Sequence, residues 1–154
     1  MALTRFTALA AGLMLAVALA GAFAIASQAG TGASSSRSRA LHVEKECGDY
    51  HGLPGQYCTI TASNLPAIRV DSKVFYFEAL AGTELDSDLA LYAGPGNVAL
   101  GHVTLSLTTY TGVITFRGGT GDFRGFRATA DVTLDQDTGL WHWDGTYRFR
   151  GRGR

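Results

Sequence analysis

Apolar and polar residues alternate over much of the chain after residue 43. Between residues 126 and 134, Phe, Ala, Ala, Val and Leu occupy every second position, with Arg, Thr and Asp between them. Residues 141–149 repeat the pattern with two tryptophans, a tyrosine and a phenylalanine. A period of two residues is typical of a strand with one buried and one solvated face. We therefore predict two antiparallel strands here, joined by a hairpin turn at residues 135–139.

Similar short runs, rich in β-branched and aromatic residues, recur upstream between Gly, Pro, Asn and Asp clusters. We place strands at residues 57–61, 67–70, 73–80, 86–92, 97–108, 112–117, 125–134 and 140–150. About eight strands suffice to close a small barrel, and closure removes exposed sheet edges. The sequence therefore predicts an all-β fold, a single antiparallel eight-stranded β-barrel of lipocalin-like topology. An immunoglobulin-like sandwich is the alternative, although its Cys, Trp, Cys spacing is missing.

The first 29 residues have a different composition. Arg5 precedes an uncharged run whose apolar centre is mostly Ala and Leu. This layout, followed by small residues, is typical of a secretory signal peptide, and we expect cleavage after Ala26 or Ala29. An uncleaved transmembrane anchor is the alternative, because the run is about long enough to span a bilayer. We assign the chain to a signal peptide at 1–29, a flexible Ser/Gly-rich linker at 30–42, the barrel at 43–150 and a disordered tail at 151–154.

Cleavage would remove one of 13 basic residues and none of the 13 acidic residues. A net charge near zero gives no electrostatic preference for nucleic acid or for an anionic membrane. We therefore expect a secreted or periplasmic protein with no nucleic-acid partner and no membrane association after cleavage. Export exposes Cys47 and Cys58 to an oxidising compartment, so a disulfide between them is the default. A metal site is the alternative, with His51 as the only nearby imidazole.

The most distinctive segment is 116–126, which reads Phe-Arg-Gly-Gly-Thr-Gly-Asp-Phe-Arg-Gly-Phe. It is not a P-loop, because no Lys followed by Ser or Thr comes after its last glycine. It is not a dinucleotide fingerprint either, because Arg124 stands where a glycine is required. We predict a tight connection between two strands, in which glycines adopt positive φ and Phe123 and Phe126 anchor the turn to the core.

This segment resembles the allene oxide cyclase and dirigent-type barrels, in which a strand leads into Gly-Gly-(Thr/Ser)-Gly-x-Phe-x-Gly and then into another long strand. Residues 101–105 and 143–147 fit the same strand order, and residues 57–61 (Tyr-Cys-Thr-Ile-Thr) are similar to bacterial secreted relatives. The resemblance covers residues 74–149. It implies a barrel in which an apolar molecule is confined and isomerised or cyclised without a cofactor. The Glu, Cys and Asn set of the plant cyclases has no residue-by-residue match here.

Three residues are the catalytic candidates: Glu78, Tyr76 and His102. By alternation Glu78 shares a strand face with Tyr76, and a carboxyl group in an apolar lumen can act as an acid. The alternative is that the phenylalanines on the other face of this strand form the core and that Glu78 is solvated. His102 belongs to a polar row that is either the wet exterior or a hydrated lumen.

The ligand-binding candidates are four aromatic residues: Tyr57, Tyr92, Trp141 and Trp143. Their rings suit a flat ligand, although two tryptophans on one strand face are commonly core residues. Asp86 and Asp88 point the same way and suggest a Ca²⁺ site, but further oxygen ligands at fixed spacing are missing. We expect no cofactor and no bound metal.

Three functions fit these features. They are a cofactor-free isomerase or cyclase, a protein that binds an apolar small molecule in the barrel, and a structural secreted protein with a filled core. The formation of a homo-oligomer is left open. A lumen packed solid with side chains would exclude a ligand, and ionisable or hydroxyl groups converging inside it would favour the enzyme over the binder.

Overall fold

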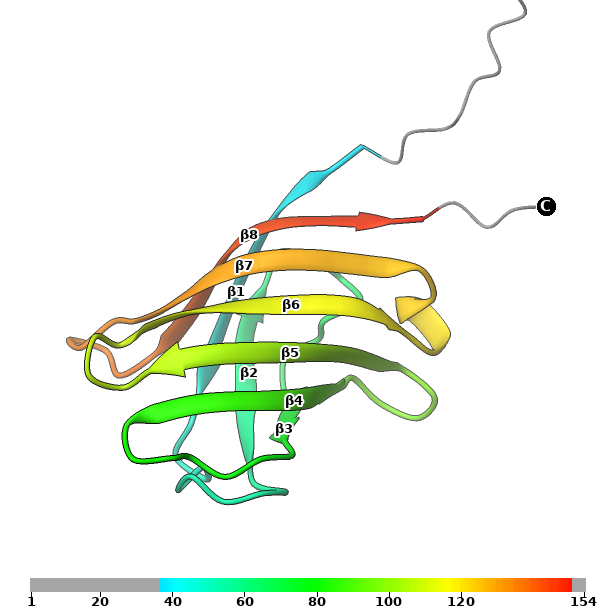
Figure 1. Cartoon of the computed structure of the whole chain (residues 1–154). Coiled ribbons are helices and arrows are strands. Elements are labelled where there is room, and N and C mark those ends of the chain that lie inside the picture. The colour runs from blue at the N-terminus through cyan, green and yellow to red at the C-terminus, as the bar shows by residue number, and fades with distance from the viewer. Residues whose placement is uncertain (1–36, 151–154) are drawn as a thin grey trace, which may run out of the picture. The chain divides into compact units, whose positions relative to one another are not determined.

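The computed structural model describes residues 37–150, so the expected signal peptide, the tail and most of the linker lie outside the described residues. Within these residues eight strands follow one another, with one short 3₁₀ turn before the seventh (Figure 1). The elements are β1 (Arg39–Glu46), β2 (Tyr57–Ser63), β3 (Lys73–Tyr76), β4 (Glu84–Tyr92), β5 (Val98–Ser106), β6 (Thr111–Gly119), η1 (Gly121–Phe123), β7 (Phe126–Leu134) and β8 (Trp141–Phe149).

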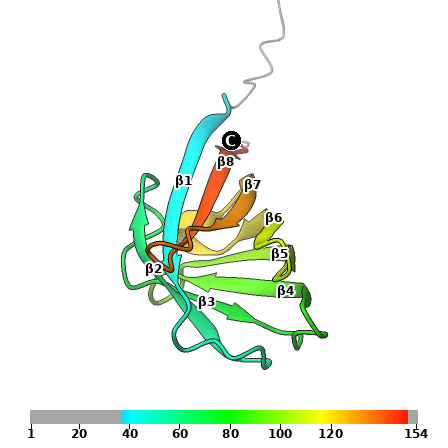
Figure 2. The same ribbon diagram turned by 90° about the vertical axis from the view of Figure 1, so that its left-hand side faces the viewer.

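The strands form a closed antiparallel barrel in sequence order (Figure 2). Each strand pairs with the next, and β1 closes the barrel by pairing with β8 from Arg39↔Tyr147 to Lys45↔Trp141. The predicted fold class is confirmed, and a two-sheet sandwich is excluded. Among residues 37–150, no helix is long and apolar enough to cross a membrane.

Alternation along the strands fills the barrel with apolar side chains. On β8, Trp141, Trp143 and Tyr147 are buried, while His142 and Asp144 lie on the outer face. Rings from three strands and η1 pack together at one end of the lumen. Their centroids are 5.5 Å apart for Phe116 and Phe126, 5.7 Å for Phe116 and Trp143, and 5.4 Å for Phe123 and Phe126.

The glycine-rich segment forms the predicted tight connection between β6 and β7. Gly118, Gly121 and Gly125 have positive φ values of 144°, 55° and 74°. A side chain at Gly121 would place Cβ 2.1 Å from the Asn97 side-chain oxygen, so only glycine fits there. Phe123 and Phe126 are fully buried, which confirms that they anchor the turn.

Two segments differ from the sequence prediction. Residues 39–42 were assigned to the linker but belong to β1, which the prediction missed because its alternation includes a lysine at a buried position. Residues 67–70 were predicted as a strand but form a turn, in which the Ile68 N–H donates to Leu65 O. Ile68 is nevertheless buried, so its short apolar run marks a loop packed on the core rather than a strand.

The third strand is also shorter than predicted. It ends at Tyr76 instead of continuing to residue 80. The Phe77 N–H is shared between Asp88 O and the Ser87 hydroxyl, both at 3.1 Å. The Glu78 N–H donates to the same hydroxyl, at 3.2 Å. Alternation counted from β3 therefore does not extend to Glu78.

Candidate functional site

A cavity of about 210 Å³ lies in the barrel at the end that carries the β5–β6 and β7–β8 hairpins. Figure 2 views the barrel from this end. Strands β1 to β5 and β8 contribute to its wall, together with the loop between β1 and β2. The lining residues are Lys45, Cys47, Tyr50, Cys58, Tyr76, Leu80, Leu85, Leu105, Leu107 and Trp141. The lumen is therefore filled at the aromatic end and hollow at this one.

The loop at residues 47–56 is fixed over this end of the barrel. The predicted disulfide between Cys47 and Cys58 is confirmed, and it joins the start of the loop to β2. The Gly55 N–H donates to Tyr76 O at 2.7 Å, and the Leu80 N–H donates to Gly52 O at 2.9 Å. These bonds tie the loop to β3 and to the segment after it.

Lys45 is the only buried charged residue among those described, with 3% of its surface exposed. Because β1 alternates, Lys45 follows the inward-facing Leu41 and Val43, so its side chain enters the lumen. Its amine donates to the disulfide sulfurs, at 3.1 Å to Cys47 Sγ and 3.5 Å to Cys58 Sγ. Sulfur is a weak acceptor, so these contacts leave much of the donor capacity unmet.

The amine has no carboxylate partner among the described residues. Its nitrogen lies 5.3 Å from the ring centroid of Trp141, 5.8 Å from Tyr76 and 5.9 Å from Trp143. Burial disfavours the ammonium form and lowers the pKa of Lys45 to about 7. The ring faces act in the opposite direction, because they attract a cation. An amine in this setting can accept a proton or attack a carbonyl carbon near neutral pH.

Two tyrosines accompany the amine in the cavity wall. The rings of Tyr50 and Tyr76 pack with centroids 4.7 Å apart. Burial raises the pKa of both phenols, so both are neutral hydrogen-bond donors at physiological pH. The Tyr50 hydroxyl is buried and has no hydrogen-bond partner within residues 37–150. A buried polar atom of this kind is rare in folded proteins, and a bound ligand group or water would satisfy it.

The structure brings part of the predicted site together. Tyr76 and Trp141 line the cavity, and Trp143 packs beneath the Lys45 amine. Glu78 lies on the exposed surface after β3, where its Oε2 accepts from the Asp88 N–H at 2.6 Å. The three catalytic candidates therefore do not meet, since only Tyr76 faces the lumen.

The remaining candidates lie on the outer face of the barrel. His102 bridges two carboxylates, at 2.9 Å from Asp86 and 2.9 Å from Asp88, in place of the suggested Ca²⁺ arrangement. Tyr57 packs against Phe75 outside the lumen with the two rings tilted by 60°, and Tyr92 is 41% exposed at the end of β4.

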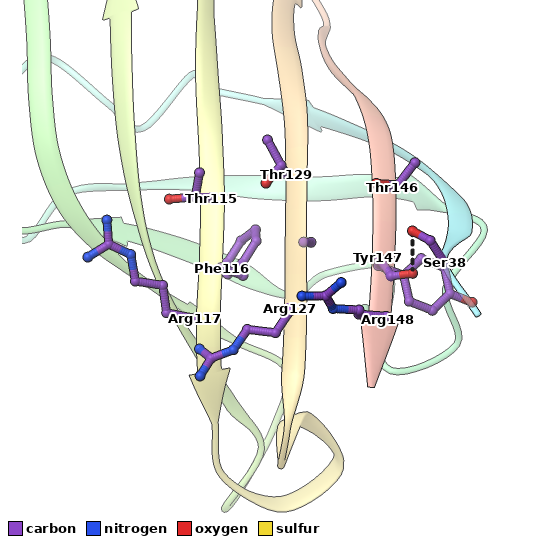
Figure 3. A pocket seen from close by; sticks show the side chains of 10 residues that line it. Ser38, Thr115, Phe116, Arg117, Arg127, Thr129, Thr146, Tyr147 and Arg148 are labelled. Carbon is purple, nitrogen blue, oxygen red and sulfur yellow. Dashed lines mark hydrogen bonds between the residues drawn. The ribbon is translucent and has the colours of Figure 1, made fainter. Parts of the chain in front are cut away.

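A second hollow lies on the outer surface of β6, β7 and β8 and has a volume of about 310 Å³ (Figure 3). Arg117, Arg127 and Arg148 line it, one from each strand, and none forms a salt bridge with a described residue. Arg127 and Arg148 are directly opposite each other in the β7–β8 register. Like charges at such positions destabilise a sheet. This hollow is basic and solvated, in contrast to the apolar cavity around Lys45.

The sequence prediction missed Lys45 and Tyr50. Lys45 would have been found if β1 had been recognised, because alternation from Leu41 and Val43 places it inside. Tyr50 lies in a loop, and the predicted disulfide was the one sequence feature indicating that this loop folds back on the barrel.

Comparison with known proteins found no match to a protein-family model, to a curated protein or to a solved structure. The resemblance to the allene oxide cyclase and dirigent-type barrels therefore stays a prediction. A function is therefore inferred from the fold and the cavity.

Proposed function

We propose that this protein binds a small, mostly apolar molecule with an oxygen acceptor in the cavity around Lys45. The observation that carries the proposal is that one apolar cavity holds two hydrogen-bond donors whose bonding capacity is not satisfied. In the part of the chain that the structure describes, the Lys45 amine contacts sulfur and aromatic rings alone, and the Tyr50 hydroxyl has no hydrogen-bond partner. Pockets that combine an apolar wall with a few convergent polar groups are typical of small-molecule sites.

The volume sets the size of the ligand. A dry cavity of about 150 Å³ holds a benzene molecule. The cavity of about 210 Å³ therefore suits one ring with a short substituent, roughly eight to ten non-hydrogen atoms. A carbonyl or carboxylate oxygen on that ring would accept hydrogen bonds from Lys45 and Tyr50, while leucines and Trp141 would surround the apolar part.

Native mass spectrometry of the exported protein tests for a co-purified ligand, and titration with benzaldehyde and benzoate tests the site directly. Tryptophan fluorescence is the readout, because Trp141 lines the cavity and Trp143 lies close to the Lys45 amine. We expect Lys45→Met and Tyr50→Phe to weaken binding of both probes by about tenfold or more, since each removes a donor to the ligand. Tyr57→Phe is the matched control, because Tyr57 lies outside the lumen. Equal binding by wild type and Lys45→Met would refute the proposal.

A second candidate function is a cofactor-free isomerase or cyclase, as the family resemblance implies. The observation that favours it is the convergence of an amine and two phenols on one cavity. The Lys45 amine would take a proton from the carbon next to a ligand carbonyl, and the Tyr50 hydroxyl would donate a hydrogen bond to the carbonyl oxygen. Returning the proton to a different carbon would complete an isomerisation.

Proton abstraction is measured by hydrogen–deuterium exchange at the α-carbons of cyclohexanone in D₂O, followed by NMR. We expect wild type to accelerate the exchange and Lys45→Met to abolish the acceleration. If wild type binds the probe without accelerating exchange, the protein is a binder and not an enzyme of this kind.

We also infer that the protein works outside the cytoplasm. The disulfide is consistent with an extracellular or periplasmic location. The signal-like composition of residues 1–29 supports export through a cleaved signal peptide. The mass of the exported chain tests this, and we expect it to begin at Ser27 or Gly30. A mature chain that still carries residues 1–26 would contradict cleavage.

A further inference from the structure

Four ionisable side chains meet on the outer face of the barrel, at the seam where β1 closes on β8. His42 is directly opposite Asp144 in the register, and Glu44 is directly opposite His142. Their neighbours Val43 and Trp143 are buried, so all four side chains lie on the outer face. The pairing of two strands thus places two imidazoles and two carboxylates side by side.

The spacing of three of these groups matches a metal-binding site. His42 Nε2 lies 3.5 Å from Glu44 Oε1, and His142 Nδ1 lies 3.8 Å from the same oxygen. One ligand atom from each of the three residues lies within 4.8 Å of the other two. Ligands at about 2.1 Å from a tetrahedral Zn²⁺ ion are separated by roughly 3.4 Å. Small side-chain rotations would therefore suffice to complete the site.

Asp144 holds His42 in the orientation that a metal requires. The distance between His42 Nδ1 and Asp144 Oδ1 is 2.6 Å. A hydrogen bond from Nδ1–H to this carboxylate keeps the proton on Nδ1 and leaves the Nε2 lone pair directed away, on the side of Glu44. Metal-binding histidines typically donate their second ring N–H to a carboxylate in this way.

We propose that His42, Glu44 and His142 bind Zn²⁺, with Asp144 as the positioning residue for His42. Two imidazoles and one carboxylate are a ligand set that proteins use for zinc sites with an open position. The side chains of the three ligands are 46%, 29% and 21% exposed, so solvent reaches the site and a water molecule can occupy the fourth position.

A metal at this position would join the first and last strands of the barrel. His42 and Glu44 belong to β1, and His142 belongs to β8. An ion bound by both strands favours the folded state, because the three ligands are brought together only when the seam is closed. The site is independent of the cavity ligand, since Lys45 points into the lumen and these side chains point out.

The test is isothermal titration of ZnCl₂ into wild-type protein that has been stripped with EDTA and dialysed. We expect one Zn²⁺ ion per chain and a rise in thermal midpoint on binding. His142→Gln and Glu44→Gln should abolish both effects. Asp144→Asn should weaken affinity by about 10- to 100-fold, the usual loss when a residue that orients a ligand is changed.

His102→Gln is the matched control, because His102 also lies on the outer face between two carboxylates but belongs to a different strand pair. It should bind Zn²⁺ like wild type. Circular dichroism of each metal-free variant checks that the barrel is intact. The proposal is overturned if wild type shows no stoichiometric binding, or if folded His142→Gln binds as tightly as wild type. In either case the four side chains are a network of surface ion pairs only.

Discussion

Replacing Lys45 by Met removes the buried amine and keeps a flexible apolar side chain of similar length. Burial lowers the pKa of Lys45 from 10.5 to about 7 in the folded protein. Between about pH 7 and pH 10.5, the unfolded chain therefore binds more protons at this residue than the folded chain does. The contribution of Lys45 to stability is least favourable below pH 7, and it improves as pH rises through that window.

The size of this effect follows from the pKa. Each unit of difference corresponds to about 1.4 kcal/mol, so the change amounts to roughly 4 to 5 kcal/mol between pH 6 and pH 10.5. The aromatic faces around the amine attract the ammonium form and reduce the change, so we expect about 3 to 4 kcal/mol. Lys45→Met lacks this dependence. The unfolding free energy of Lys45→Met should exceed that of wild type by the largest amount at pH 6, and this difference should decrease as pH rises.

The measurement is guanidinium unfolding of wild type and Lys45→Met from pH 6 to pH 10, followed by tryptophan fluorescence in the presence of EDTA. The chelator removes any contribution from metal at the barrel seam. Lys73→Met is the matched control, because Lys73 lies on the outer face of β3. Titration of other groups is the same in both proteins and cancels in the difference. A difference between wild type and Lys45→Met that stays constant with pH would refute the reasoning.

Three further predictions concern stability. Reduction of the disulfide, which closes a loop of sequence separation 11, should lower the unfolding free energy by about 3 kcal/mol, measured by urea unfolding with and without reductant. Gly145→Ala should lower the unfolding free energy by about 2 to 4 kcal/mol in the same assay, because its Cβ would lie 2.1 Å from Thr129 O. Gly48→Ala is the control, since its Cβ would meet the flexible side chain of Glu46. Arg148→Thr should raise the thermal midpoint at low salt by relieving repulsion within the basic hollow, and the gain should disappear at high salt.

The barrel could be predicted from the sequence because its signals are local. The alternation of 126–134 and of 141–149 identifies two strands and their buried faces without any knowledge of the fold. The turn between β6 and β7 was predicted because positive φ restricts several of its positions to glycine. The disulfide was predicted from the pairing of the only two cysteines. Each of these features depends on residues close together in the chain or on a count.

The candidate site could not be predicted in the same way, because it depends on contacts between distant segments. Glu78 seemed to share a face with Tyr76, but β3 ends between them, and the Glu78 N–H donates to the side chain of Ser87 on β4. Alternation is reliable only while a strand continues, and the residue that ends β3 is remote in sequence. The position of the buried Tyr50 hydroxyl likewise depends on how a loop packs over the barrel.

Both proposed sites depend on β1, the strand that the sequence pattern did not reveal. Its residues alternate between two environments, so Glu44 on the outside is followed by Lys45 on the inside. The strand is hard to recognise from the sequence because Lys45, at an inward position, interrupts the apolar pattern that identifies strands. That same residue would contact the ligand, and a buried amine destabilises the fold unless something stabilises its charge. If Lys45→Met is more stable than wild type but does not bind the probes, the lysine is retained for its chemistry rather than for the fold.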